Sequence, residues 1–454
     1  MLEGLEITEA MLSETIKNKD FRVDSQFYTK APIKNPRLMY SKIGDIIHSS
    51  QYGISIEMNE DKKGYPIYRM NELHDMLCDL DVNKFAAISS EEYKRFALKN
   101  CDVLFNRTNS FEWVGRTGIY YQNDDIERTF ASYLVRFNPI ESIILPEYLC
   151  AFLNTRQGIN EIKRRARQSI NQTNVNPEEV KEIEIPILDM DLQKEIKQHF
   201  EIANFKRVQS LKLYREAEIQ LLSELGLKGW QPCNNSVNIK QLKESFLASG
   251  RLDAEYYQSK YEDYTSFIRK YMNGADALGN ICTLNEKNFN PVDNSEYKYI
   301  ELSNIGNSGE ITGCTTSIGA ELPSRARRLV HTNDVIVSSI EGSLQSVALV
   351  TDEYDKAICS TGFYVINSKN INPETLLVLF KSEPMQNLLK QGCSGTILTA
   401  IGKTELSNIV IPKIRKEVQI KIADYVQQSI SLRNEAKQLL NEAKVMVERE
   451  IEKG

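Results

Sequence analysis

Cysteine and histidine are the residue types in this chain that could hold a metal or act as nucleophiles, and their spacing argues against both roles. The eight cysteines contain no CxxC pair, and the four histidines show no metal-ligand spacing. We therefore expect buried free thiols and no metal site.

Motifs for catalysis or cofactor binding are also missing. A DNA amino-methyltransferase needs an Asn/Asp-Pro-Pro-aromatic motif, and the four Asn-Pro pairs of the chain lack the second proline and the aromatic residue. The segment Gly395–Thr404 resembles a phosphate-binding loop, but six residues separate its glycines where four are needed. The sequence thus predicts a protein that is not an enzyme and that binds no cofactor itself.

A basic segment followed by polar residues is a candidate for nucleic-acid binding. The stretch Arg156–Arg167 carries five basic residues and one acid, and amide and hydroxyl side chains follow it directly. Basic groups can hold phosphates while Gln, Asn and Ser read base edges in the major groove. The alternative is a solvated helix face followed by a loop. The candidate DNA-binding residues of this segment are Lys163, Arg164, Arg165, Arg167, Gln168 and Asn171.

Other candidates lie in turns after predicted strands and in the second half of the chain. In both places an ordinary turn or a solvated surface is the alternative. The formal net charge of −6 argues against nucleic-acid binding unless positive charge gathers locally, because DNA affinity rests largely on neutralised phosphates. These further candidates are Arg107, Asn109, Ser110, Arg325, Arg327, Arg328, Ser343, Ser394 and Thr396.

Length and composition favour a multidomain cytoplasmic protein. The 454 residues are too many for one hydrophobic core, so two or three domains are expected. No apolar run approaches the roughly 20 residues that cross a bilayer. The first residues have neither the basic flank nor the apolar stretch of a signal peptide.

The chain repeats one plan twice. Matching segments keep their order, and their offset drifts only from about 226 to 235 residues, which indicates a duplication. In each copy an Ile-Pro pair is followed by a Gln that opens a helical segment. The matches are Phe21–Tyr28 with Gly250–Tyr257, Ile43–Ile46 with Leu278–Ile281, Tyr68–Leu73 with Ile300–Ile305, Asp102–Phe105 with Asp334–Val337, and Ile183–Pro186 with Ile409–Pro412.

Each copy begins with about 170 residues of mixed strands and helices. Runs rich in β-branched and aromatic residues predict paired strands. A proline in the first turn marks the start of a helix, because the missing N–H costs nothing there. The predicted strand pairs are 102–105 with 118–121 and 334–338 with 347–350, and the predicted helices are 146–155 and 373–383.

Each copy then ends in one long helix of about 34 residues, roughly 50 Å at 1.5 Å per residue. From Val418 to Glu450, mostly apolar or small residues step by four and three, which is a heptad seam. One apolar face runs from Ile196 to Leu225 in the first copy, and Gly226 ends that helix. Neither helix can bury its stripe alone, so we expect the two to pack together. A coiled-coil dimer between chains is the alternative.

This order of motifs resembles the specificity subunits of type I restriction–modification systems over nearly the whole chain. Asn100–Arg107 looks like a conserved strand of that family, and Asn333–Val337 is its partner in the second copy. The Ile-Pro ending followed by a Gln-bearing helix is also similar. No single motif is specific, but their duplicated order is.

The resemblance implies an α+β fold with two pseudo-symmetric α/β target-recognition domains separated by a pair of long antiparallel coiled-coil helices. It also implies double-stranded DNA as ligand, two methyltransferase (modification) subunits that carry S-adenosylmethionine, and restriction/translocase subunits as partners. The two copies differ in their loops, so the DNA target should be asymmetric. The predicted parts are an N-terminal lead 1–20, recognition domains 21–188 and 229–413, and long helices 189–228 and 414–454.

The resemblance also predicts that the long helices measure the DNA spacer. Helices near 50 Å should set the two half-sites apart by about one to one and a half turns of B-DNA. Lengthening one helix by a few residues is expected to lengthen the spacer and to leave both half-sites unchanged, as read by sequencing methylated adenines in host DNA. A fixed spacer would contradict this prediction.

Two other readings remain open at this point. A single-chain nuclease or methyltransferase would bind S-adenosylmethionine or cleave DNA as the purified chain alone. A DNA-recognition adaptor of another defence system would lack neighbouring genes for modification and restriction subunits.

Overall fold

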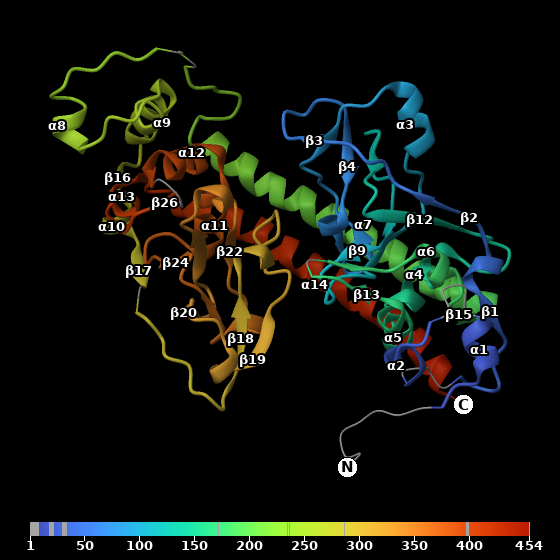
Figure 1. The fold of residues 1–454 in the computed structure, drawn as a ribbon. Coiled ribbons are helices and arrows are strands. Elements are labelled where there is room, and N and C mark those ends of the chain that lie inside the picture. The colour runs from blue at the N-terminus through green and yellow to red at the C-terminus, as the bar shows by residue number, and fades with distance from the viewer. Residues whose placement is uncertain are drawn as a thin grey trace. The chain divides into compact units, whose positions relative to one another are not determined.

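The computed structural model describes residues 9–17, 22–29, 34–170, 172–233, 235, 237–285, 287–395 and 399–453. The chain forms two compact units (Figure 1). Unit 1 consists of Met1–Val208 and Leu432–Gly454, and unit 2 consists of Gln209–Ser431. Within the described ranges, no helix combines the length and the apolar character that crossing a membrane requires.

Unit 1 mixes short strands with helices. Its largest sheet has the strand order β2-β12-β8-β10-β6-β5, and smaller sheets have the orders β11-β4-β7-β3, β13-β14-β9 and β1-β15. Its elements are α1 Leu12–Lys17, α2 Ser25–Thr29, β1 Tyr40–Lys42, η1 Ile43–Asp45, β2 Ile47–Tyr52, β3 Met58–Asn59, β4 Tyr65–Tyr68, η2 Met70–Glu72, β5 Leu73–His74, β6 Leu77–Cys78, β7 Phe85–Ala86, α3 Ser90–Phe96, β8 Asp102–Asn106, β9 Thr108–Asn109, β10 Thr117–Tyr120, β11 Thr129–Phe130, β12 Leu134–Pro139, α4 Pro146–Leu153, α5 Arg156–Arg165, β13 Arg167–Gln168, β14 Thr173–Asn174, α6 Pro177–Lys181 and β15 Glu184–Pro186.

Unit 2 repeats this plan. Its sheets have the strand orders β17-β24-β21-β22, β19-β18-β23-β20, β16-β27 and β25-β26. Its elements are α8 Phe246–Ser249, α9 Ser259–Arg269, β16 Ala275–Ala277, α10 Leu278–Ile281, β17 Thr283–Asn285, β18 Glu296–Ile300, η3 Leu302–Asn304, β19 Thr315–Ile318, η4 Gly319–Glu321, β20 Ala326–Leu329, β21 Val335–Ser338, η5 Glu341–Ser343, β22 Val347–Leu349, η6 Asp352–Tyr354, β23 Ile358–Ser360, β24 Phe363–Asn367, α11 Pro373–Lys381, α12 Glu383–Gly392, β25 Cys393–Ser394, β26 Ala400–Ile401, α13 Lys403–Asn408 and β27 Val410–Pro412.

The predicted strand pairs are confirmed in both units. Strands β8 and β10 are antiparallel, with Val103 opposite Ile119. Strands β21 and β22 are antiparallel in the same way, with Ile336 opposite Ala348. The parallel pairing of β4 with β11 likewise recurs between β18 and β23. The duplication seen in the sequence is therefore a duplication of topology.

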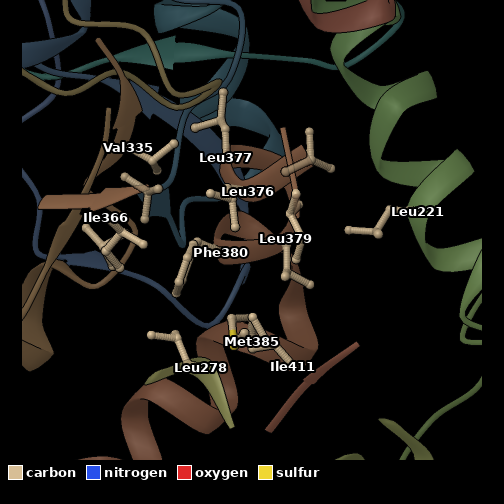
Figure 2. Close-up of a cluster of buried hydrophobic side chains, with 14 of the residues drawn as sticks. Leu221, Leu278, Val335, Ile366, Leu376, Leu377, Leu379, Phe380, Met385 and Ile411 are labelled. Carbon is tan, nitrogen blue, oxygen red and sulfur yellow. The ribbon is translucent and has the colours of Figure 1, made fainter. Parts of the chain in front are cut away.

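The core of unit 2 lies between α11 and the sheet that contains β21 and β24 (Figure 2). Every residue of α11 after Pro373 is buried, as expected for a helix that is apolar on most of its faces. The side chains that meet in this core include Leu278, Val335, Ile366, Leu376, Leu377, Leu379, Phe380, Met385 and Ile411. Helix α11 ends at Lys381, before the predicted Glu383, because Ser382 takes an extended conformation and α12 starts after it.

Two long helices, α7 (Met190–Glu224) and α14 (Lys416–Glu452), contribute to both units. In each unit they pair antiparallel, since residue numbers rise along α7 as they fall along α14. The paired residues are Lys206–Glu435 and His199–Glu442 in unit 1 and Ser210–Ser429 in unit 2, where Glu224 also pairs with Arg415, the residue before α14. The predicted helix stop is confirmed, because α7 ends at Glu224 and Gly226 adopts a φ of +72°.

The buried stripe of α14 differs from the predicted heptad seam in three places. Val426 is buried, whereas the predicted Tyr425 is only partly buried. Toward the end of the helix, Leu440 and Val447 are buried, whereas the predicted Leu439 and Met446 are only partly buried. This part of α14 packs into the hydrophobic core of unit 1, so its buried face is wider than a seam of two residues per heptad.

A buried glutamine fixes the start of each long helix. The Oε1 atom of Gln193 accepts a hydrogen bond from Leu145 N (2.8 Å), directly before α4. Its Nε2 donates to the carbonyls of Ile143 (3.2 Å) and Leu188 (2.9 Å). Gln419 makes the same three kinds of contact in unit 2, with Asn372 N (2.9 Å), Asn370 O (3.0 Å) and Ile414 O (2.8 Å). The Gln that follows each Ile-Pro pair therefore has a structural role.

Glu147, in the first turn of α4, is a buried carboxyl group with few partners. Its Oε1 accepts a hydrogen bond from the Tyr121 hydroxyl (3.1 Å), and its Oε2 has no hydrogen-bond partner among the described residues. Burial raises the pKa of Glu147 because it disfavours the charged form.

We expect Glu147→Gln to stabilise unit 1 increasingly as pH rises. Below about pH 4 the carboxyl is protonated in the folded and the unfolded chain, so it adds no pH dependence. As pH rises, the unfolded chain ionises first, and the wild-type free energy of unfolding falls until the folded carboxyl ionises too. Urea unfolding at about pH 5 and about pH 8 checks this. The exposed carboxyl of Glu141 is the control, and an equal pH trend for Glu141→Gln would contradict the prediction.

Candidate nucleic-acid interface

A three-stranded sheet in unit 1 brings together two groups of candidate residues that lie about 60 positions apart in the sequence. Strand β14 pairs with β13 on one side and with β9 on the other. Arg167 lies opposite Asn174, and Asn109 lies opposite Thr173. A hydrogen bond from Thr108 Oγ1 to Asn174 Oδ1 (2.6 Å) further joins β9 to the central strand β14. The hairpin β13–β14 and the turn after β9 thus form one polar surface.

The hairpin presents several side chains to solvent. The Arg167 side chain is 53% exposed although it forms an ion pair with Glu179 (2.9 Å). Gln168 and Ser110 are exposed, and Asn109 is half-buried. The tip is closed by a hydrogen bond from Ser169 N to Gln172 O (2.8 Å). The candidate Asn171 lies outside the described residues.

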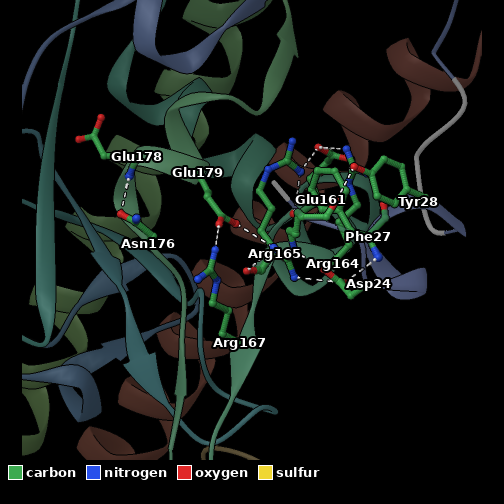
Figure 3. A network of polar contacts seen from close by, with 11 residues as sticks. Asp24, Phe27, Tyr28, Glu161, Arg164, Arg165, Arg167, Asn176, Glu178 and Glu179 are labelled. Carbon is green, nitrogen blue, oxygen red and sulfur yellow. Dashed lines mark hydrogen bonds and ion pairs between the residues drawn. The ribbon is translucent and has the colours of Figure 1, made fainter. Parts of the chain in front are cut away.

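Two basic candidates on α5, Arg164 and Arg165, form contacts inside unit 1 (Figure 3). Arg165 is 5% exposed and forms an ion pair with Glu161. Arg164 pairs with the same carboxylate (2.7 Å) and donates to the Phe27 carbonyl (2.6 Å). The guanidinium groups of Arg164 and Arg165 both lie over the Phe27 ring, at 4.4 and 5.5 Å from its centroid. These contacts hold α5 against the segment that precedes β1.

Lys163 fixes the loop that follows β9. Its Nζ donates to the carbonyls of Glu112 and Val114, each at 3.0 Å, and to that of Phe111. Burial lowers the pKa of Lys163 to about 8. The side chain therefore shapes the loop beside the hairpin and is not free to contact a phosphate.

Arg107 lies at the base of the same surface and is half-buried. Its guanidinium lies 5.2 Å from the centroid of the Tyr52 ring and donates to the Ser132 carbonyl (3.4 Å). Its Nε is buried and has no hydrogen-bond partner among the described residues. Arg107 thus anchors the start of β9 to Tyr52 and Ser132.

Unit 2 builds an equivalent surface around the hairpin β25–β26. Ile340 bridges Ala400, so a third strand segment lies beside β26 as β9 lies beside β14. The candidate Ser394 is exposed, and Ser343 Oγ contacts Ser338 Oγ (3.0 Å). The candidate Thr396 lies outside the described residues. A shallow hollow of about 270 Å³ beside η5 is lined by η5, the two residues after it and α12.

The three arginines of the second copy are spread along β20 and its start. Arg325 is 60% exposed, donates to Glu301 (2.7 Å), and its carbonyl accepts from Thr361 N (2.8 Å). The neighbouring Gly362 carbonyl accepts from Ser339 N (2.8 Å), so Arg325 is linked to the third strand segment of this surface. Arg327 and Arg328 bond Asn290 (3.4 Å) and Asn288 (3.0 Å), farther along β20.

Sequence reasoning missed Arg22 and Glu179. Glu179 accepts from Arg167 and from Arg22, both at 2.9 Å, and so links the hairpin to the segment before β1. For Arg22 the sequence does contain a signal, because both copies carry an Arg-x-Asp triplet at matching positions.

Metal-binding chemistry finds no support in the part of the chain that the structure describes. No group of three or more His, Cys, Asp or Glu side chains is placed to hold a metal ion there. The eight cysteines are free thiols, and five of them are buried.

Comparisons with known proteins agree with the duplicated plan. A family model described as the type I restriction modification DNA specificity domain matches residues 37–203 and again residues 277–444. The putative type I restriction enzyme MjaX specificity subunit of Methanocaldococcus jannaschii is 28% identical over 156 residues, 34% of this chain and 36% of that protein. The EcoKI specificity subunit of Escherichia coli K12 is 26% identical over 137 residues, 30% of this chain and 29% of that protein. The matches thus span about a third of these relatives.

The chain also aligns with solved structures at low sequence identity. The S subunit of a type I restriction-modification system from M. genitalium aligns over 92% of this chain and 96% of that one, at 13% identity and a TM-score of 0.38. The HsdS subunit from Thermoanaerobacter tengcongensis aligns over 94% of this chain and 99% of that one, at 12% identity and a TM-score of 0.31. Because the family model covers well over half of the residues, the chain belongs to the family of type I restriction–modification DNA specificity domains and carries two copies of that domain.

Proposed function

We propose that this chain is the subunit that selects the DNA sequence for a type I restriction–modification complex. It reads one half of a bipartite double-stranded target with the hairpin β13–β14 and the other half with the hairpin β25–β26. The first hairpin presents an exposed arginine and glutamine where the second has a buried cysteine and an exposed serine, so the two half-sites differ.

The observation that carries this proposal is the repeated three-stranded arrangement. Each unit holds a short hairpin beside a third strand segment, and residues of that surface are exposed and polar. Arginine reads guanine and glutamine reads adenine through paired hydrogen bonds in the major groove. Arg167, Gln168 and Ser110 are the first candidates in unit 1, and Arg325, Ser343 and Ser394 are those in unit 2. This surface is supported inside unit 1 by the contacts of Lys163, Arg164 and Arg165.

We place the chemistry on partner subunits. Two methyltransferase subunits carrying S-adenosylmethionine dock on α7 and α14, restriction and translocase subunits join them, and this chain is non-catalytic. Exposed apolar side chains on the long helices support docking, since Phe205 is 61% and Ile420 is 68% exposed. The proposed recognition domains keep the boundaries 21–188 and 229–413, and the proposed helical regions are 189–228 and 414–454.

We expect the double substitution Arg167→Ala, Gln168→Ala to relax one half-site and to leave the other intact. Loss of base contacts costs about 1–3 kcal/mol of discrimination at the positions that are read. The measurement is the selection of bound duplexes from a randomised pool by the chain assembled with its methyltransferase subunits.

A matched control is Arg156→Ala, which also removes one positive charge from the predicted basic segment. Its side chain is 77% exposed at the other end of α5 and pairs with Glu452 (2.5 Å). We expect this variant to retain both half-sites. If the double variant weakened binding to all sequences equally, the hairpin would hold the backbone and would not read bases.

A further inference from the structure

The same four-residue arrangement holds the start of each hairpin in both units. The arrangement is called here the clamp, and its residues are Arg22, Asp24, Phe27 and Tyr28 in unit 1, and Arg251, Asp253, Tyr256 and Tyr257 in unit 2.

In unit 1 the clamp binds the end of α5. Arg22 is 10% exposed, and its Nη1 donates to the Arg165 carbonyl (3.0 Å) and to Glu179 (2.9 Å). Its Nε donates to Asp24 (2.5 Å), which aims the guanidinium. The Arg165 carbonyl is one of the last four of α5, which have no partner within the helix. The hairpin begins two residues later, at Arg167.

In unit 2 the clamp binds the end of α12 in the same way. Arg251 pairs with Asp253 through Nε (2.8 Å) and Nη2 (2.6 Å). Its Nη2 also donates to the Cys393 carbonyl (2.9 Å), and its Nη1 donates to that of Gln391 (3.3 Å). Cys393 is itself the first residue of β25.

The aromatic residues of the clamp complete the arrangement. The guanidinium of Arg22 lies 4.9 Å from the Phe27 ring centroid, and that of Arg251 lies 4.4 Å from that of Tyr256. In each unit the next tyrosine donates its hydroxyl hydrogen to the carbonyl of the clamp arginine, at 2.7 and 2.9 Å. In each unit, the carboxylate, the aromatic ring and the backbone turn of the clamp together fix the direction of the arginine's guanidinium group.

We infer that Arg22 and Arg251 are positioning residues, each of which sets the angle at which its own hairpin leaves the preceding helix and so determines the reading of one half-site. This inference rests on the proposed function of the hairpins. Arginine suits this task because its planar fork can bond a carboxylate and backbone carbonyls at once, whereas a lysine provides one point charge. A small change of angle at the junction displaces the side chains that read bases. The clamp arginine thus acts on the reading without contacting the DNA.

The test is selection from a pool of duplexes with a randomised stretch of about 40 base pairs, by the full chain assembled with its methyltransferase subunits. We expect Arg22→Ala and Arg22→Lys to lower the enrichment of one half-site about tenfold and to change the other less than about twofold. Arg251→Ala and Arg251→Lys should do the reverse. The unaffected half-site shows in the same experiment that the other unit is folded and that the complex has assembled.

Two further variants keep the test decisive. Arg156→Ala, which removes an exposed positive charge at the other end of α5, should leave both half-sites unchanged. If Arg22→Ala does not fold, Asp24→Asn replaces it, since it removes only a half-exposed carboxylate that aims Arg22, and we expect a loss of about threefold at the same half-site.

The outcomes separate the two hypotheses. Equal loss at both half-sites, or no loss, in the Arg22 variants overturns the clamp inference when the double variant Arg167→Ala, Gln168→Ala relaxes one half-site. If that double variant also leaves both half-sites intact, the proposed function of the hairpin fails.

Discussion

Replacing Arg136 with alanine is expected to lower the free energy of unfolding of unit 1 by about 3–5 kcal/mol, because it leaves a buried carboxylate without its partner. Arg136 and Asp102 are 7% exposed each, and their ion pair measures 2.8 Å. Arg136 also donates to the Ala97 carbonyl (2.7 Å) and to Gln51. Burial raises the pKa of Asp102 even though Arg136 favours its charged form, so the carboxylate is poorly stabilised once Arg136 is absent.

The chain offers a simple optical measurement of this effect. It has two tryptophans, Trp113 in unit 1 and Trp230 in unit 2. Urea unfolding in a Trp230→Phe background therefore follows unit 1 through Trp113. The control is Lys42→Ala, which removes an ion pair with Glu182 that is about half exposed on both sides and should cost less than about 1 kcal/mol. Similar losses for the two variants would refute the argument from burial.

A comparable loss, about 3 kcal/mol, is expected for Gln193→Ala. The substitution leaves three buried backbone groups without their partner, namely one N–H before α4 and two carbonyls. Alanine is the better helix former, so the intrinsic helix propensity of α7 opposes the loss and cannot explain it. Gln419→Ala should produce the same loss in unit 2, detected through Trp230.

Gln198→Ala provides the matched control for this prediction. Gln198 lies on the same helix and is exposed, so its substitution should change the free energy of unfolding by less than about 0.5 kcal/mol. If Gln193→Ala were equally mild, ordered water would have to replace the amide, and the glutamine would not be needed to join α7 to α4.

The duplicated plan and the long helices could be predicted because local sequence patterns specify them. Strand β8 starts with Asp102-Val103, and Asp334-Val335 stands at the start of β21 in the same way; the stop of α7 follows from Gly226. The depth at which individual side chains are buried could not be predicted in the same way. Leu440 is buried more deeply than Leu439 because α14 also packs into the core of unit 1, and that contact involves residues far away in the sequence.

The candidate site was predicted as a region but not in the roles of its residues. Runs of basic residues indicate positive charge, yet whether a side chain is free depends on partners elsewhere. Arg165 is neutralised by a neighbour one helical turn away, and Lys163 is held by carbonyls about 50 positions earlier. The joining of β9 to β14 is likewise a long-range pairing that no local pattern specifies.

The compact units are not the same as the repeated copies, and this has a consequence for how the gene could be divided. The core of unit 1 includes Ala436, Leu440, Ala443 and Val447 from the second copy, and the core of unit 2 includes Tyr214, Ala217, Leu221 and Leu225 from the first. If the chain were divided between the copies, each fragment would lack the part of a long helix that completes its hydrophobic core. The two fragments would then fold by complementing one another. A gene encoding one copy alone would specify a chain whose missing part must come from a second molecule.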